Sequence, residues 1–290
     1  MFYSIKELVE QADLDFNGNV AELMIATEYE LTGRERDEVL RLMGRNLEVM
    51  KASVLLGLDE SKSRSGLTGG DAAKLHHYIQ SGKALSDYTV LTAAKNAIAV
   101  NEHNAKMGLV CATPTAGSAG CLPAVLTSAI EKLDLTEGQQ LDFLLAAGAF
   151  GLVIANNASI SGAEGGCQAE VGSASAMSAA SLVLAAGGSA FQASQAICFV
   201  IKNMLGLICD PVAGLVEVPC VKRNAMGASY AFIAADMALA GIESKIPVDE
   251  VIDAMYQVGS SLPTAFRETA EGGLATTPTG RRLSKEIFGE

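Results

Sequence analysis

The chain is short of positive charge. It has 21 lysines and arginines against 33 aspartates and glutamates among 290 residues, which gives a formal net charge of -12 at pH 7. Proteins that bind nucleic acid neutralise phosphates with clustered basic side chains. The charge balance therefore argues against a nucleic-acid partner, and the length allows one large domain or two small ones.

The amino-terminal sequence, MFYSIKELVEQADLDF, has no basic leader followed by an apolar run and no small-residue cleavage site. Such a start is not typical of an exported protein, so we expect a cytoplasmic location. In a reducing cytoplasm, cysteines serve as metal ligands, catalysts or core residues more often than as disulfides. We expect the same of the six cysteines of this chain.

Strand patterns are scarce. Alternating runs of Val, Ile and Thr are few, whereas Ala and Leu, which favour helices, are frequent. No repeat or long linker divides the chain, and SKSRSGLTGGD is the best candidate for a boundary. The sequence predicts an all-α fold in which a single helical domain over 1–290 has buried Gly/Ala/Ser-rich helices and Gly-rich loops at helix N-termini. The helices are expected at 4–12, 19–33, 35–58, 87–106, 122–133, 137–155, 172–186, 189–208, 224–241 and 247–262.

Three stretches have no charged side chain, at 107–130, 143–163 and 171–201. Each is long enough to raise the question of a membrane span. They are rich in Gly, Ser and Ala rather than in Leu, Ile and Phe, which a lipid-facing helix favours. We therefore expect helices buried inside the domain and no membrane partner.

Four Gly-rich loops precede helical runs, and their hydroxyl and backbone donors suit a carboxylate or a phosphate. None matches the P-loop or the G-x-G-x-x-G dinucleotide motif. Each alone is compatible with an ordinary helix cap, but together they predict that several loops converge on one small anionic ligand. They are SRSGLTGGDAAKL (63–75), TPTAGSAGCLPAVL (113–126), NNASISGAEGGCQAEVG (156–172) and TPTGRRL (277–283).

The cysteines fall into two groups by their neighbours. Cys111, Cys121 and Cys198 lie among Val, Ala, Leu and Ile, where buried cysteine acts as a small hydrophobic residue. The other three lie beside turn residues, where a thiolate can be directed inward to a metal: Cys167, Cys209 and Cys220.

Three thiolates predict an incomplete metal site. His76, His77 and His103 are not at a zinc spacing to them, and there is no C-x-x-C pair. A structural zinc prefers four protein ligands, whereas a 4Fe-4S cluster held by three thiolates leaves one iron open as a Lewis acid. A zinc site stays open as an alternative. The basic side chains near the cysteines that could balance a cluster's charge are Lys202, Lys222 and Arg223.

Long motifs in the chain resemble the α subunit of the bacterial iron-sulfur-dependent L-serine dehydratases (L-serine ammonia-lyases). The resemblance runs from about residue 10 to the carboxyl end. It is based on NNASISGAEGGCQAEVGSASAM, CDPVAGLVEVPCVKRNA, TPTAGSAG and SGLTGGD.

The resemblance implies an all-helical catalytic domain with an oxygen-sensitive 4Fe-4S cluster held by Cys167, Cys209 and Cys220. It implies that L-serine is the substrate and that a β subunit carrying an ACT-type regulatory module is the partner, because the chain starts directly with the catalytic part. A homo- or hetero-oligomer is expected.

The substrate carboxylate is expected to bind loop donors, and an α-proton must leave to a base. His103 has a suitable side chain for this base, and Lys222 would serve only if burial disfavoured its charged form; the base could also come from the β subunit. The candidate substrate-binding residues are Ser65, Thr68, Gly69, Thr113, Thr115, Gly117, Ser118 and Asn157.

Other functions stay open at this point. The same cluster could act on L-threonine or L-cysteine, which differ little from L-serine for a pocket. A pyridoxal phosphate enzyme would use a Schiff-base lysine, with Lys74, Lys95 or Lys222 as candidates, but would leave the three loop cysteines unexplained. A helical zinc-binding or membrane protein without catalytic activity is the non-enzymatic alternative.

Overall fold

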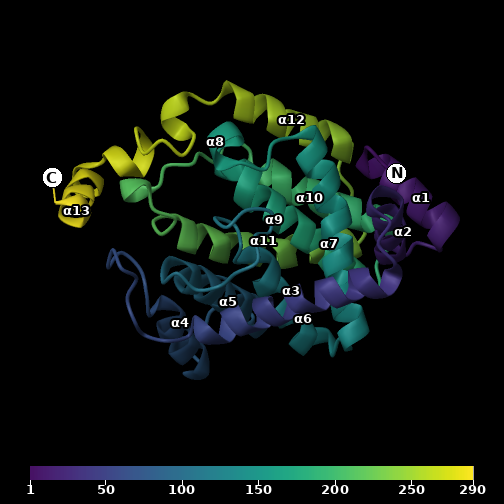
Figure 1. The fold of residues 1–290 in the computed structure, drawn as a ribbon, viewed down its shortest axis with the longest axis horizontal. Helices are drawn as coiled ribbons and strands as arrows, with labels where there is room; N and C mark the ends of the chain where they lie inside the picture. The colour runs from purple at the N-terminus through teal and green to yellow at the C-terminus, as the bar shows by residue number, and fades with distance from the viewer. Residues whose placement is uncertain (290) are drawn as a thin grey trace.

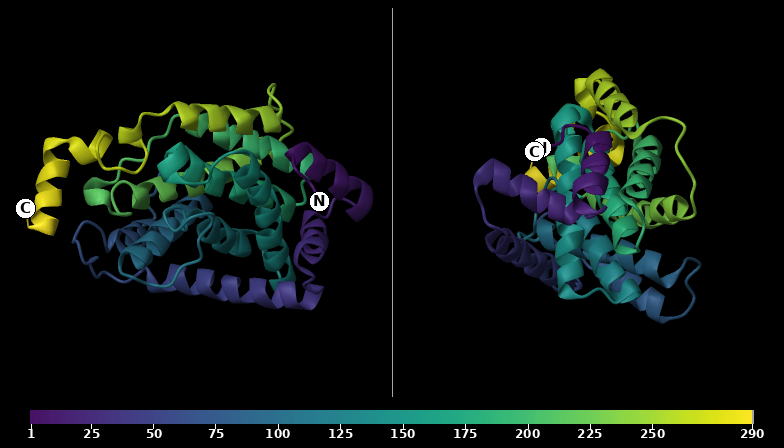
Figure 2. Two further views of the ribbon diagram at one scale, coloured as in Figure 1. Left: turned by 45° about the horizontal axis from the view of Figure 1, so that its top comes forward. Right: turned by 90° about the vertical axis from the view of Figure 1, so that its right-hand side faces the viewer.

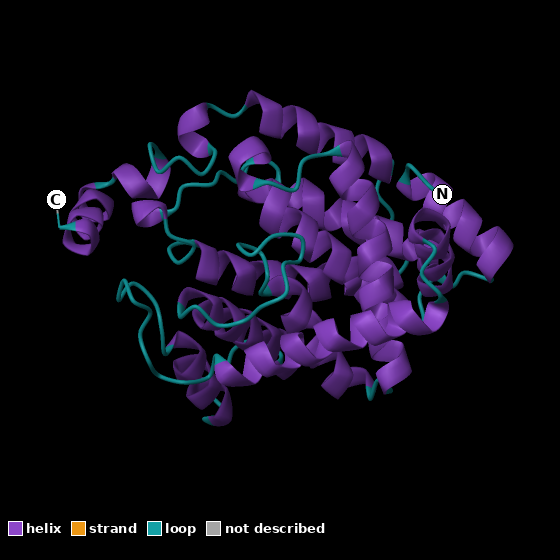
Figure 3. Cartoon of the chain, in the orientation of Figure 1, coloured by secondary structure: helices purple, strands orange, loops and turns teal. Residues whose placement is uncertain are grey.

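The computed structural model describes residues 1–289, and that part of the chain contains helices and turns but no β-strand (Figures 1 and 3). The prediction of an all-α fold is confirmed. The α-helices are α1 (Ile5–Phe16), α2 (Val20–Thr32), α3 (Arg36–Leu56), α4 (Asp71–Gln80), α5 (Tyr88–Ala105), α6 (Cys121–Leu133), α7 (Glu137–Asn157), α8 (Gly162–Gly165), α9 (Ser173–Ala185), α10 (Ala190–Met204), α11 (Cys220–Leu239), α12 (Val248–Ser261) and α13 (Pro278–Phe288).

Short helical turns complete the fold. A π-helical turn, η1 (Gln168–Gly172), leads directly into α9, and three 3-10 turns lie at η2 (Val212–Gly214), η3 (Thr264–Phe266) and η4 (Gly273–Thr276). The helix expected from 224 begins earlier, at Cys220, because Pro219 stands at its N-cap position.

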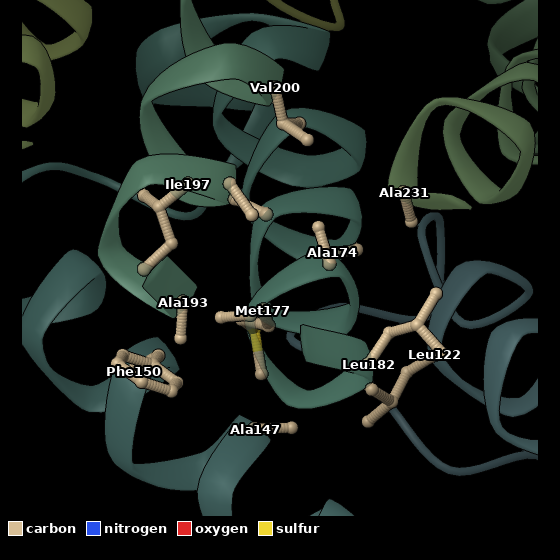
Figure 4. Close-up of a cluster of buried hydrophobic side chains, with 14 of the residues drawn as sticks. Leu122, Ala147, Phe150, Ala174, Met177, Leu182, Ala193, Ile197, Val200 and Ala231 are labelled. Carbon is tan, nitrogen blue, oxygen red and sulfur yellow. The ribbon is translucent and has the colours of Figure 1, made fainter. Parts of the chain in front are cut away.

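The helix α9 forms the centre of the molecule and packs against α6, α7, α10 and α11. Its side chains from Ser173 to Val183 are all buried, and most are Ala or Ser. Small side chains on every face let the neighbouring helices approach closely. Figure 4 shows the core around it, with Met177 and Leu182 from α9 among the side chains of its neighbours, Leu122, Ala147, Phe150, Ala193, Ile197 and Ala231.

The uncharged stretches contain core helices, but residues 107–120 of the first stretch form a loop. Among residues 1–289, α7 is the one helix long and apolar enough to cross a membrane by length and composition, a test that core helices also pass. It packs against α2, α3 and α9, and most of its apolar window is buried in these contacts. The expectation of buried helices is therefore confirmed for α7 and α9.

The two ends of the described chain lie at opposite ends of the molecule (Figures 1 and 2). The amino-terminal α1 packs on α2 and α10, whereas α13 contacts η2 and η4. Between α12 and α13 the chain folds back on the segment 209–220. There Cys209 N–H donates to the Phe266 carbonyl at 2.9 Å, and Glu268 N–H donates to the Cys209 carbonyl at 2.9 Å.

Candidate active site

Three turns bring Cys167, Cys209 and Cys220 together. Cys167 follows Gly166, whose φ of 75° gives the left-handed turn that ends α8, and it stands at the start of η1. Cys209 lies in the short bridge with Arg267. Cys220 is the first residue of α11. The sequence expectation that loop ends direct these thiols inward is confirmed, since their exposed fractions are 2%, 3% and 8%.

The three thiols lie near enough to influence one another's ionisation. Burial raises the pKa of Cys167 to about 11, an effect that the nearby Arg223 guanidinium partly offsets. Burial raises the pKa of Cys220 to about 12, and repulsion from Cys167 and Glu170 in their ionised forms adds to the rise. The pKa of Cys209 is also raised, first by burial and then by Glu170, Cys167 and Cys220. As free thiols, all three are therefore protonated at neutral pH.

No three His, Cys, Asp or Glu side chains within residues 1–289 are placed to hold a single metal ion. The arrangement does not match the closed sphere of a structural zinc, which gathers its ligands around one ion. A multi-iron cluster has a different requirement, because each of its irons takes its own thiolate.

The turn between Cys209 and Cys220 closes on itself. Val212 N–H donates to the Val218 carbonyl at 2.8 Å, and Gly214, with a φ of 68°, turns the chain within η2. Asp210 anchors the turn, because its buried carboxylate accepts from Leu274 N–H at 2.7 Å and pairs with Arg223 at 3.0 Å.

The first Gly-rich loop already encloses a carboxylate of the protein itself. Glu102 of α5 is fully buried, and its carboxylate lies at the N-terminus of α4. It accepts hydrogen bonds of 2.9 to 3.3 Å from Thr68 Oγ1 and from the backbone N–H groups of Gly69, Asp71 and Ala72. This loop does bind an anion, but the anion is the protein's own Glu102, and the convergence of several loops on one anionic ligand stays a prediction. Thr68 and Gly69 therefore have their donors engaged.

The same loop is tied to the cysteine turn by a second carboxylate. Ser63 Oγ and Ser65 Oγ donate to Glu217 at 2.6 and 2.8 Å, and Glu217 is buried just before Cys220. The hydroxyl of Ser65, a candidate for the substrate carboxylate, is thus bonded within the protein. It holds the loop 63–70 against the segment that supplies two of the thiols.

The second loop meets a third carboxylate, that of Glu170 in η1. Thr115 Oγ1 donates to Glu170 Oε1 at 2.9 Å, and a side-chain carbon at Gly117 would lie only 3.2 Å from the same oxygen. Ser118 Oγ donates within the loop to the Thr113 carbonyl at 3.1 Å, while Thr113 Oγ1 is buried without a partner.

Glu170 also lies beside the thiols. A side-chain carbon at Gly162 would lie 2.7 Å from Glu170 Oε2 and 3.1 Å from Cys209 Sγ, so the carboxyl group and the thiol approach one point. Burial raises the pKa of Glu170, the Thr115 hydrogen bond opposes this rise, and the negative charge of Glu268 adds to it. The group is therefore a carboxyl able to exchange a proton nearer to neutral pH than an exposed glutamate.

The two candidate bases have other partners. Lys222 is half-exposed and pairs with Asp71 at 2.5 Å, so the burial that its role as a base requires is missing. His103 lies at the end of α5 against Gly108, and burial lowers its pKa, with Lys106 and Asp59 as its charged neighbours. Unlike Glu170, Lys222 and His103 have no recorded contact with the three thiols. Their catalytic roles stay predictions.

Two further candidates lie elsewhere. Asn157 is exposed at the end of α7 and donates to the carbonyls of Tyr3 and Val153, so the structure does not bring it to the thiols. Lys202 donates to Ser244 Oγ at 2.9 Å. Among the three basic residues predicted to balance the thiol site, Arg223 is the one whose charge acts on Cys167.

The expectation of core cysteines is confirmed for Cys121 and Cys198, which are fully buried, and is confirmed in part for Cys111, which is only partly buried but packs against the core. Cys111 is partly exposed beside the Asn46 carbonyl, because it lies in a loop on the edge of the core. All six cysteines are free.

The sequence reasoning missed the three buried glutamates. A signal was present: Glu170 is the only acidic residue between 165 and 209, and Glu217 stands alone between apolar neighbours. An isolated charge in a buried segment is costly unless it is hydrogen-bonded, so it indicates a structural or catalytic role. Spacing alone could not show which loops would supply the donors.

The fold and the site define an all-helical domain with a buried thiol centre at the meeting of Gly-rich loops. The family model described as "Serine dehydratase alpha chain" matches residues 15–275. The chain therefore belongs to the serine dehydratase α chain family, and the resemblance found in its motifs is confirmed.

Individual relatives agree with this family. The chain is 60% identical over 289 residues to the "Probable L-serine dehydratase, alpha chain" of Bacillus subtilis (strain 168), covering 100% of this chain and 96% of that one. It is 42% identical over 272 residues to the "L-serine dehydratase, alpha chain" of Peptoniphilus asaccharolyticus, covering 93% of each. It is 36% identical over 286 residues to "L-serine dehydratase TdcG" of Escherichia coli (strain K12), covering 94% of this chain and 61% of that longer one.

Proposed function

We propose that the chain is the catalytic α subunit of an L-serine dehydratase, which deaminates L-serine to pyruvate and ammonia. We further propose that Cys167, Cys209 and Cys220 hold a 4Fe-4S cluster at which the β-hydroxyl is eliminated. The relatives named L-serine dehydratase support the substrate. The cluster is supported by one observation above all: three separate turns bury these three thiols beside one another.

The residues present fit such a cluster. The donor set is three thiols at turns, whereas Cys121, whose pKa is raised by burial and also by Cys167, packs in the core; Arg223 lowers the pKa of Cys167 against the effect of burial. A positive charge at this point favours the thiolate form that iron requires. When bound, a 4Fe-4S cluster with three protein ligands supplies Lewis acidity at an iron open to substrate.

Glu170 is the group in this chain best placed to move a proton. It ends beside Cys209, and Thr115 orients it through Oε1. In the proposed reaction Glu170 takes the α-proton of L-serine while the β-hydroxyl leaves as hydroxide. The resulting aminoacrylate tautomerises to an imine, and water hydrolyses the imine to pyruvate and ammonia.

The loops around the thiols position these groups and limit solvent. Glu217 fixes the loop 63–70 on the turn before Cys220, and Asn224 binds the Gly117 carbonyl at 2.8 Å. Both contacts join a Gly-rich loop to the segment at the start of α11. An enclosed site strengthens electrostatic interactions and protects a cluster from oxygen.

We also propose that the enzyme is cytoplasmic and works with a second, β chain that carries the ACT-type module. Two relatives are named alpha chains, a name that belongs to enzymes with more than one kind of chain. Six free cysteines suit a reducing compartment.

The cluster is tested by purifying the full chain without oxygen, alone and with its β partner. Iron, acid-labile sulfide and pyruvate formed from L-serine are measured for each sample. Replacing Cys167, Cys209 or Cys220 by Ser should remove iron and activity together, because each thiolate holds its own iron. Cys198→Ser is the matched control, since Cys198 is as deeply buried but packs in the core.

Two results would contradict the proposal. One is full activity in a preparation without iron, above all if pyridoxal phosphate restores it. The other is an equal loss of iron in Cys198→Ser, which would show that the loss reports damaged folding rather than lost ligands.

Glu170→Gln tests the proton transfer. The variant should keep iron and sulfide but lose about 100-fold or more in kcat, the size of a general-base contribution. Thr115→Val, which removes only the orienting hydrogen bond, should lose less. If Glu170→Gln leaves kcat unchanged, Glu170 is not the base, and the base is His103, Lys222 or a residue of the β chain.

A further inference from the structure

A cavity of about 370 Å³ lies between α8 and α12, and none of the three thiols lines it. We call it the α8–α12 cavity. Its walls include Gly165, Ala169 and Gly259, and a side-chain carbon at Gly259 would lie 2.9 Å from Gly165 Cα. Small residues thus let the two helices meet at one edge. The volume is in the range of sites that bind small molecules.

Polar groups of both signs line this cavity. Arg267 supplies a guanidinium and Glu164 a carboxylate, and Ser159, Tyr256 and Ser260 add hydroxyl groups. A ligand that carries one positive and one negative charge would complement both charged residues. A free α-amino acid has this arrangement of charges.

The guanidinium of Arg267 is only partly satisfied. Its Nη2 donates to the Ser260 carbonyl, which fixes its direction, but its Nε–H is buried without a partner. Within residues 1–289, no carboxylate forms an ion pair with it. A buried donor on a charged group without an acceptor is unfavourable, and a carboxylate is its best acceptor because it can accept two parallel hydrogen bonds.

The α8–α12 cavity is joined to the thiol site through the backbone. Arg267 pairs with Cys209 in the isolated bridge, and Gly165 and Ala169 flank Cys167 in the chain. A ligand held by Arg267 would therefore restrain the segment that carries Cys209. It would not need to touch the thiols.

We propose that the α8–α12 cavity binds a small α-amino acid, with Arg267 taking the carboxylate and Glu164 the ammonium group. The probe is L-alanine, which lacks the β-hydroxyl and so cannot undergo the elimination. Binding is measured by calorimetry and saturation-transfer NMR on the full anaerobic chain and on Cys220→Ser. Because Cys220→Ser lacks the proposed cluster site, binding to it would separate this inference from the proposed reaction.

Three comparisons define the recognition. L-Alaninamide, which has no carboxylate, should bind about tenfold more weakly than L-alanine or not at all, and Arg267→Gln should weaken L-alanine binding by about the same factor. Glu164→Gln should weaken L-alanine binding but not the binding of pyruvate, which has no ammonium group. Arg34→Gln is the matched control, because Arg34 lines another cavity but is already paired with Glu28 at 2.6 Å.

Hydrogen exchange gives an independent measurement that needs no variant. L-Alanine should slow exchange of the backbone N–H groups of Cys209 and Glu268, which form the bridge beside Arg267. Equal binding of L-alanine and L-alaninamide, or unchanged L-alanine binding in both Arg267→Gln and Arg267→Lys, would overturn the proposal. The absence of L-alanine binding at about 10 mM would also overturn the proposal, because a site with two charge pairs should bind more tightly than this concentration requires.

Discussion

Three buried glutamates stabilise the loops of this molecule by accepting hydrogen bonds rather than by pairing with lysine or arginine. Glu102 accepts from one hydroxyl and three backbone N–H groups, Glu217 from two serine hydroxyls, and Glu170 from Thr115. Hydrogen bonds to a charged acceptor are stronger than neutral ones, and they offset the cost of burying the charge. Each glutamate joins segments that are far apart in the chain.

Asp71 offers a prediction about pH. Its carboxylate is bonded to Lys222 and Lys74, and mainly the Lys222 bond lowers its pKa from 3.8 to about 2. Because the folded pKa is the lower one, the ionised pair stabilises the fold above pH 3.8, and this contribution is lost as pH falls toward 2.

Asp71→Asn should therefore lower the free energy of unfolding at pH 7 by less than about 1 kcal/mol, since the lysines are exposed. The difference in the free energy of unfolding between Asp71→Asn and the wild type should become smaller below pH 4, which is roughly the ordinary pKa of an aspartate. Urea unfolding of the metal-free chain between pH 3 and 7 measures it. Asp15→Asn, at an exposed position on α1, is the control. A stability difference between Asp71→Asn and the wild type that grows as pH falls would contradict the prediction.

Helices of small residues give this fold its close packing. In α11, Gly227 faces the core so tightly that a side-chain carbon there would lie 2.8 Å from Val171 Cγ1 and 2.9 Å from Cys121 Sγ. In α7, Gly148 has no atom within 4 Å of the same position. Gly227 is therefore required by close packing in the core, whereas Gly148 is not limited by its neighbours.

Gly227→Ala and Gly148→Ala form a matched pair for a stability experiment. The first should lower the free energy of unfolding by about 1 to 3 kcal/mol, because the added methyl group forces packed helices apart. The second should raise it by up to about 1 kcal/mol, because alanine loses less backbone entropy than glycine in a helix. The midpoints of urea unfolding measure both, and equal shifts would mean that packing at Gly227 is not limiting.

The molecule as a whole gathers its thiol site from distant parts of the chain. Cys167 precedes the central helix, Cys209 and Cys220 follow α10, and the return segment after α12 covers Cys209. Few buried apolar contacts hold this return segment, where most side chains are partly or fully exposed. We therefore expect contacts at the thiol site to hold this segment more than contacts with the core do.

Removal of the proposed cluster should therefore loosen the site locally. With iron chelated, hydrogen exchange should rise in 162–172, 205–220 and 262–276 while α9 and α10 stay protected, and the melting temperature should fall because a ligand of the native state is gone. Exchange that rises equally in α9 would mean that the site and the core unfold together.

Much of the fold could be predicted from the sequence. The helical pattern of apolar residues placed α1, α3, α7 and α12 close to their observed bounds, because side-chain periodicity is local. Turn residues separated Cys167, Cys209 and Cys220 from Cys121 and Cys198 for the same reason. The partners of the loop donors could not be predicted, because Glu102 and Glu217 reach Thr68 and Ser65 across long separations in the chain.

The sequence by itself determined the helical fold, the three turn cysteines, the Gly-rich loops and the family. These follow from local periodicity, turn chemistry and long motifs. Only the tertiary structure decided that Glu102 accepts the donors of the first Gly-rich loop, that Glu170 lies beside Cys209, and that Lys222 pairs with Asp71. Hydrogen bonds between distant segments depend on how the helices pack. A short sequence pattern therefore cannot predict which distant donor will bind a buried carboxylate.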